Sequence, residues 1–120
     1  MNVQANTTRG PTRRQIVLGW TATALPIGAW MVHLTGEAAL VRLACEHRNV
    51  EWYMHALTAG TALICLACLA IGVTYARRPA AEPGNGAFRF LGILAASVAF
   101  VNLLVIVWEG SYVPFLPLCR

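Results

Sequence analysis

Imidazole and carboxylate side chains recur in one part of this sequence, and together they could hold a metal ion or a haem. The histidines are His33, His47 and His55, and the acids near them are Glu37, Glu46 and Glu51. Imidazole nitrogens and carboxylate oxygens bind copper or zinc, and two histidines can hold a haem iron between them. Glu109 follows the last apolar stretch of the chain. The candidate ligands for copper or haem are therefore His33, His47, His55 and Glu109.

The spacing of these residues does not match a known ligand motif, so a structural role is the simpler interpretation. The sequence contains no H-x-x-H or H-x3-H pair and no C-x-x-C-H. Acids and arginines near a surface commonly pair with each other or with water. On this interpretation Trp52 and His55 are structural residues, and His55 donates a hydrogen bond to a neighbouring carbonyl or carboxylate. We then expect the protein to have no cofactor of its own.

The four cysteines fall into two groups with different surroundings. Cys65 and Cys68 form a C-x-x-C pattern inside an apolar stretch, where thiols are inert and cysteine serves as a small buried residue. This argues against zinc binding or redox chemistry at that pair. Cys45 and Cys119 instead lie in the segments that follow the first and the last apolar stretch.

The composition is that of a membrane protein. Apolar residues make up 58 % of the chain and charged residues 12 %, whereas a soluble domain carries about 25 % charged residues. All nine basic residues are arginines, and they are scattered between long apolar blocks. A net charge of +4 that is distributed in this way favours a lipid bilayer over nucleic acid as the partner.

Three apolar blocks, residues 16–34, 53–76 and 88–108, are each long enough to cross a membrane. A span needs about 20 residues to cross a hydrocarbon core of about 30 Å, and in lipid the backbone must form its hydrogen bonds within a helix. The sequence therefore predicts an all-α protein with one membrane domain over 16–120, a three-helix bundle. The remaining segments are a disordered basic N-terminal segment (1–15), an outer loop (35–51), an inner loop (77–87) and an outer tail (109–120).

The distribution of arginines predicts the orientation of the bundle. Arg9, Arg13 and Arg14 precede the first span, and Arg77 and Arg78 follow the second. Because cytoplasmic segments carry an excess of arginine and lysine, the N-terminus and the 77–87 loop should face the cytoplasm of a bacterium. The C-terminus would then lie in the periplasm, and the protein would be a multi-pass protein of the inner membrane.

This topology places Cys45 and Cys119 on the same, oxidising side of the membrane, where cysteines tend to pair. We expect a Cys45–Cys119 disulfide that staples the outer tail to the outer loop; the alternative is two unpaired thiols. Pro114 and Pro117 cannot continue a helix, so they should turn the chain out of the third span.

Small residues at helical spacing are the expected contacts between the spans. Small side chains let membrane helices approach closely. The residues expected to pack the helices are Gly60, Gly72, Gly92, Ala96 and Ala99. No span carries an acid or a lysine at mid-depth, which argues against a transporter that acts alone. We therefore expect no small-molecule substrate.

Several of these positions together resemble a known group of proteins. They are a cysteine after the first span, a W-x-x-H that opens the second (Trp52, His55) and a final P-x-x-P-x-C (Pro114, Pro117, Cys119). This pattern resembles small three-span bacterial membrane proteins, largely uncharacterised, that are often encoded beside genes for haem–copper terminal oxidases. The resemblance covers about residues 16–120 and implies that Cys45, Trp52, His55 and Cys119 are the positions to carry over. It implies a respiratory context and no particular reaction.

The expected function is that of a non-catalytic accessory subunit of a larger membrane energy-converting complex of the respiratory type. Such a subunit would contribute helix packing and an outer-face lid, with the larger subunits and the lipid bilayer as its partners. The alternative is a protein that handles copper or haem in oxidase assembly through the outer His/Glu cluster. A stand-alone thiol–disulfide carrier would need an accessible cysteine pair, which Cys65 and Cys68 do not offer.

Overall fold

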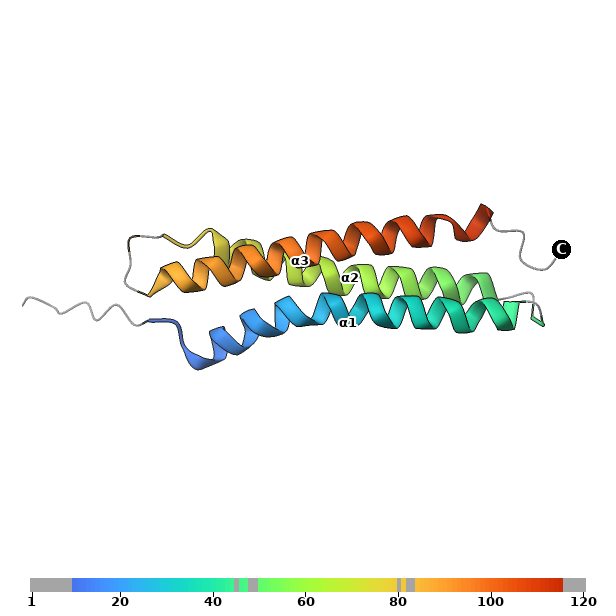
Figure 1. Cartoon of the computed structure of the whole chain (residues 1–120), viewed down its shortest axis with the longest axis horizontal. Coiled ribbons are helices and arrows are strands. Elements are labelled where there is room, and N and C mark those ends of the chain that lie inside the picture. Colours follow the sequence, from blue (N-terminus) through green and yellow to red (C-terminus); the bar gives the residue numbers. More distant parts are fainter. Residues whose placement is uncertain (1–9, 45, 48–49, 80, 82–83, 116–120) are drawn as a thin grey trace, which may run out of the picture.

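Three long helices lie side by side and make up almost all of the structure (Figure 1). The computed structural model describes residues 10–44, 46–47, 50–79, 81 and 84–115. The helices are α1 (Arg13–Ala44), α2 (Val50–Ala76) and α3 (Asn85–Ser111), and a short 3-10 turn, η1 (Val113–Phe115), follows α3. All three helices are long and apolar enough to cross a membrane. The prediction of an all-α bundle of three helices, each a candidate membrane span, is thereby confirmed.

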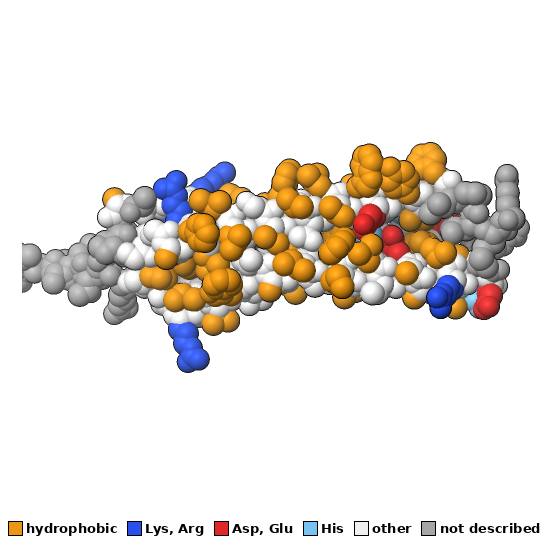
Figure 2. Space-filling model, in the orientation of Figure 1, with side chains coloured by type: hydrophobic (Ala, Val, Ile, Leu, Met, Phe, Trp, Pro, Cys, Tyr) orange, Lys and Arg blue, Asp and Glu red, His pale blue; other side chains and the backbone are white. Residues whose placement is uncertain are grey.

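The helices run up, down and up, so the bundle has two chemically different ends. We name the end where α1 and α3 begin and α2 ends the arginine end, because the described residues place five arginines there: Arg13, Arg14, Arg77, Arg78 and Arg89. At the opposite end, named the glutamate end, lie Glu37, Glu46, Glu51 and Glu109, together with Arg42. Figure 2 shows this separation of blue and red side chains along the bundle.

Helix α1 continues well beyond its apolar block, which corrects the predicted outer loop. We expected residues 35–51 to be loop, but 35–44 are the last turns of α1. This stretch, "TGEAALVRLA", contains no proline and is rich in alanine, leucine, glutamate and arginine, which are strong helix formers. With 32 residues, α1 is about 48 Å long against a hydrocarbon core of about 30 Å.

The first turn of α1 is fixed by a reciprocal pair of hydrogen bonds. The backbone N–H of Thr12 donates to the Gln15 side-chain oxygen over 3.1 Å, and the backbone N–H of Gln15 donates to the Thr12 hydroxyl over 3.4 Å. This T-x-x-Q capping box satisfies two donors that the helix itself leaves free. Residues 13–15, which we placed in a disordered segment, are therefore helical. Residues 1–9 lie outside the described part of the chain.

Two glycines bring α2 and α3 into backbone contact. A Cβ atom added at Gly72 would lie 2.5 Å from the backbone nitrogen of Ala96, and one added at Gly92 would lie 2.6 Å from that of Ala76. Because these neighbours are backbone atoms, they cannot rotate away. Ala99 is fully buried and Ala96 is half-buried beside this contact. The structure thus places Gly72, Gly92, Ala96 and Ala99 between helices, as predicted.

Gly60 does not contact another helix of the bundle, whereas three other glycines do. Gly60 is exposed, and a Cβ atom there would meet nothing within 4 Å. A Cβ atom added at Gly19 would collide with the side chain of Leu91. One added at Gly36 would collide with Leu57, and one added at Gly110 with Thr58. The sequence marks all of these glycines equally, and only the rotation of each helix decides which of them meets a neighbour.

Substitution at the glycine contact should therefore separate α2 from α3. We expect Gly72→Ala to lower the free energy of unfolding by about 1–3 kcal/mol, the usual cost of overpacking. The control is Gly28→Ala, which makes the same chemical change inside α1 where an added Cβ meets nothing within 4 Å. Thermal unfolding in detergent, followed by circular dichroism, measures the difference. Equal melting temperatures for the two variants would contradict the contact.

Candidate functional site

A completely buried histidine near the glutamate end is contacted by polar side chains from all three helices. His33, on α1, has an exposed fraction of 0 %. Its ring lies within 4 Å of Glu37, one turn further along α1, and of Glu109 on α3. Thr58 on α2 completes the group. We name these four residues the His33 cluster.

One ring nitrogen of His33 joins α1 to α2. Its Nε2 atom lies 3.1 Å from Thr58 Oγ1 and 3.2 Å from Glu37 Oε1. The Thr58 hydroxyl donates to the carbonyl oxygen of Met54 over 3.0 Å, so its own oxygen is free to accept. A proton on Nε2 is therefore shared between a hydroxyl and a carboxylate oxygen, both of which are acceptors.

The other ring nitrogen faces α3 and makes no hydrogen bond. His33 Nδ1 lies 3.5 Å from Glu109 Oε2, and both atoms are buried without a hydrogen-bond partner among the described residues. A neutral imidazole with its proton on Nε2 and an ionised carboxylate would present two acceptors to each other. Glu109 thus brings α3 to the same imidazole ring that joins α1 to α2.

Glycine allows the three helices to meet at this point. Gly110 follows Glu109 and packs directly against Thr58, so that α3 approaches α2 closely beside the cluster. Glu37 and Glu109 keep side-chain exposures of 16 % and 29 %, so both carboxylates retain contact with the surface at the glutamate end. The cluster therefore has a buried centre and a partly solvated rim.

The His33 cluster does not have the arrangement of a metal site. Glu37 and Glu109 approach opposite nitrogens of one ring, so their oxygens do not converge on a common point with an imidazole nitrogen. Within the described ranges, no group of three His, Cys, Asp or Glu residues could hold a metal ion. His47 and His55 are exposed, whereas His33 is buried. Of the four candidate ligands, the structure brings His33 and Glu109 together and places His47 and His55 at exposed positions.

The structural role that we expected for His55 belongs to His33. His55 is exposed and the described residues offer it no hydrogen bond, and Trp52 beside it is 74 % exposed. A signal for His33 is present in the sequence, because His33 and Glu37 are four residues apart and so share one face of a helix. The participation of Thr58 could not be found in this way, since it depends on how α2 is rotated.

The cysteines of the C-x-x-C pattern are part of the packed interior. Cys65 and Cys68 are both free and buried. Cys65 packs with Ala29 and Ile106, and Cys68 packs with Ala22, Ala95 and Ala99. Both serve as small core residues. Cys45 and Cys119 lie outside the described residues, so their pairing stays a prediction.

Comparison with known proteins finds no relative of this chain: no family model matches, and no curated protein or solved structure is significantly similar.

Removal of the central imidazole should loosen the glutamate end. We expect His33→Ala to cost about 1–3 kcal/mol of stability, because Glu37, Thr58 and Glu109 lose their shared partner. The control is His55→Ala, which removes the same side chain from an exposed position without partners. Thermal unfolding of the purified variants in detergent compares them. If both variants unfold at the same temperature, the His33 cluster does not hold the helices together.

Proposed function

We propose that this protein is a non-catalytic accessory subunit of a larger membrane energy-converting complex of the respiratory type. The observation that carries this proposal is an exposed row along α2 in which five of the six side chains are small. We name it the α2 seam, and its members are Ala56, Gly60, Leu63, Ala67, Ala70 and Thr74. All six are exposed in the isolated bundle.

The α2 seam has the geometry of a helix–helix contact. Its members follow one another at alternating steps of four and three residues, which keeps them on one face of a helix. A second row with the same steps, which includes Thr61, Cys65, Cys68 and Gly72, is buried against α1 and α3. Each residue of the α2 seam comes two positions after a residue of the buried row. Two positions correspond to about 200° around the helix, so the seam faces away from the bundle.

The length of the seam suits a partner that also crosses the membrane. From Ala56 to Thr74 a helix rises about 27 Å, close to the hydrocarbon thickness of about 30 Å. Close approach through small residues is a main source of helix association in lipid, where burial of apolar surface gives little gain. Gly60 has open space around it in the isolated chain, and a partner helix would fill that space.

The glutamate end supports the proposed outer-face lid. Val113 of η1 is buried together with Val50 and Met54, and Leu40 and Ala44 pack against this group. The turn after α3 is therefore held against the end of α1 and the start of α2. Ala44 directly precedes Cys45, and Phe115 precedes Cys119 by four residues, a reach of about 14 Å for an extended chain. We therefore retain the Cys45–Cys119 disulfide within this proposal.

The arrangement of charges supports the proposed orientation. With the arginine end in the cytoplasm, the bundle follows the rule that the cytoplasmic segments of bacterial inner-membrane proteins carry an excess of positive charge. The resemblance to three-span proteins encoded beside oxidase genes supports a respiratory context. A role in copper or haem handling would need His33, His47 and His55 to converge, and no observation favours it.

Bulky side chains placed in the α2 seam should release the partner. We expect the double variant Gly60→Leu/Ala67→Leu to retain less of the larger subunits in a mild-detergent purification. Each 1.4 kcal/mol of overpacking at the contact should weaken the affinity for the partner about tenfold. The control is Ala24→Leu/Gly28→Leu, which alters two exposed positions on α1. Mass spectrometry of the eluate gives the ratio of partner to bait. A wild-type eluate that holds only the 13.0 kDa chain would contradict the accessory role.

Loss of the proposed disulfide should lower the amount of assembled protein. We expect Cys119→Ser to reduce its steady-state level or its retention in the complex, because the tail is no longer tied to the end of α1. Cys45→Ser and the double variant should show the same reduction, since each removes the same bond. The measurement is quantitative immunoblotting of membranes together with thiol alkylation without reductant. Unchanged levels, or full alkylation of Cys45 and Cys119, would show that the pair does not form.

A further inference from the structure

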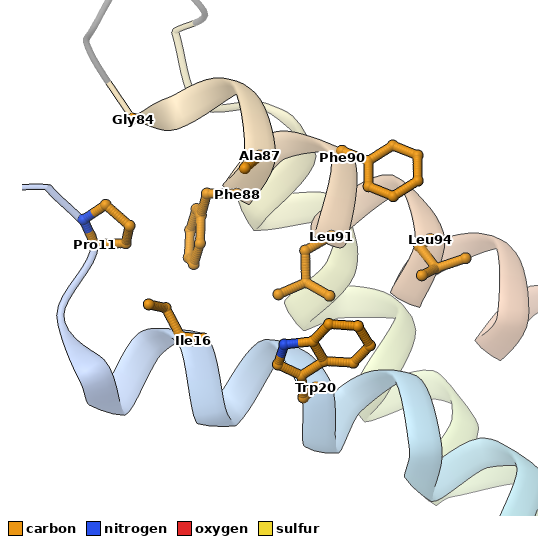
Figure 3. A pocket seen from close by; sticks show the side chains of 9 residues that line it. All are labelled: Pro11, Ile16, Trp20, Gly84, Ala87, Phe88, Phe90, Leu91 and Leu94. Carbon is orange, nitrogen blue, oxygen red and sulfur yellow. The ribbon is translucent and has the colours of Figure 1, made fainter.

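A lipid-facing pocket lies between α1 and α3 at the arginine end (Figure 3). Its volume is about 300 Å³, at the lower end of the range of ~300–1,000 Å³ that is typical of ligand sites. Its principal lining residues are Ile16, Trp20, Phe88, Phe90, Leu91 and Leu94, and the lining is almost entirely apolar. Figure 3 shows Ile16 and Trp20 of α1 facing Phe88 and Leu91 of α3 across the space.

The walls of this pocket are held in place by the packing around them. Leu91 lies against Gly19, where any added side chain would collide with it. Phe88 stacks on Tyr75 with ring centroids 4.2 Å apart. The Arg78 guanidinium lies 4.8 Å from the centre of the Phe88 ring and 5.5 Å from that of Tyr75, and these cation–π contacts help to hold both rings. The pocket is therefore formed in the isolated chain.

The position of the pocket suits an amphiphile rather than a soluble ligand. Trp20 and Phe90 at its mouth are 59 % and 67 % exposed, and both belong to helices apolar enough to cross a membrane. An acyl chain can therefore enter from the bilayer. Figure 3 shows the indole nitrogen of Trp20 on the side of Ile16 and Pro11, toward the start of α1. An indole N–H at that depth suits the polar part of a lipid.

The charged side chains described at the arginine end are all positive. None of the residues described at the arginine end is acidic, and Arg13, Arg14, Arg77 and Arg89 are exposed there. Arg13 precedes Ile16 by three residues and Trp20 by seven, so it shares their helix face at the level above the pocket. The N-termini of α1 and α3 add the positive ends of two helix dipoles. An anionic headgroup would therefore meet no repulsion from an acidic side chain among the residues described at this end.

We propose that this pocket binds an anionic phospholipid, with an acyl chain between α1 and α3 and the headgroup phosphate beside Arg13. The apolar lining selects the chain, and Arg13 together with the two helix N-termini selects a headgroup with net negative charge. This site lies on a different part of the surface from the α2 seam. The inference does not depend on the accessory role, and it can be tested on the purified full chain alone.

The test compares two lipids with identical dioleoyl chains, phosphatidylglycerol and phosphatidylcholine, on the delipidated protein in detergent. Native mass spectrometry counts the lipid molecules retained by each protein molecule. We expect retention of one phosphatidylglycerol and much weaker retention of phosphatidylcholine. Soluble glycerol 3-phosphate should not displace the lipid, because it lacks the chain. Displacement by glycerol 3-phosphate, or equal retention of both lipids, would overturn the proposal.

Two variants locate the site. Arg13→Gln should weaken phosphatidylglycerol binding about fivefold, while the control Arg42→Gln at the glutamate end leaves it unchanged. Ala87→Leu should fill the pocket and abolish retention, whereas Ala59→Leu at an exposed position of α2 should not. Unchanged binding in the arginine variant or in Ala87→Leu would overturn the proposal. The two controls report any general loss of folding.

Discussion

Helices in a bilayer gain little from hiding apolar side chains against each other, because the surrounding lipid is equally apolar. The bundle therefore depends on contacts that lipid cannot replace. At the arginine end these are the backbone contacts that Gly72 and Gly92 allow between α2 and α3. At the glutamate end they are the polar contacts of His33, which reach all three helices. The glycine contact requires that a side chain be absent, whereas the polar contact requires the imidazole of His33.

The exposed and the buried faces of α2 both carry small residues, but the two faces have different contacts. The buried row brings Cys65, Cys68 and Gly72 against α1 and α3, and the α2 seam repeats its spacing on the opposite side. The polar centre of the bundle is enclosed, whereas the α2 seam and the arginine-end pocket remain open to the surroundings. This division is consistent with a small subunit that is organised around its neighbours and its lipid.

The existence of the three helices could be predicted from the sequence because it follows from a local requirement. A long apolar block in lipid must satisfy its own backbone, whatever its neighbours are. The ends could not be predicted in the same way, since α1 continues to Ala44 through residues that favour a helix outside lipid as well. The partners of His33 and the exposure of Gly60 and His55 depend on the rotation of each helix. That rotation is set by contacts between segments distant in the sequence, which no single apolar block encodes.

The separation of charge between the two ends makes the bundle an electric dipole along the membrane normal. Five described arginines lie at one end, and four glutamates with one arginine lie at the other. A membrane potential that is negative in the cytoplasm acts on this dipole with about 2.3 kcal/mol per elementary charge for each 100 mV. In the proposed orientation, with the arginine end in the cytoplasm, an energised membrane would hold the bundle in place, because inversion would have to move both sets of charges against the field.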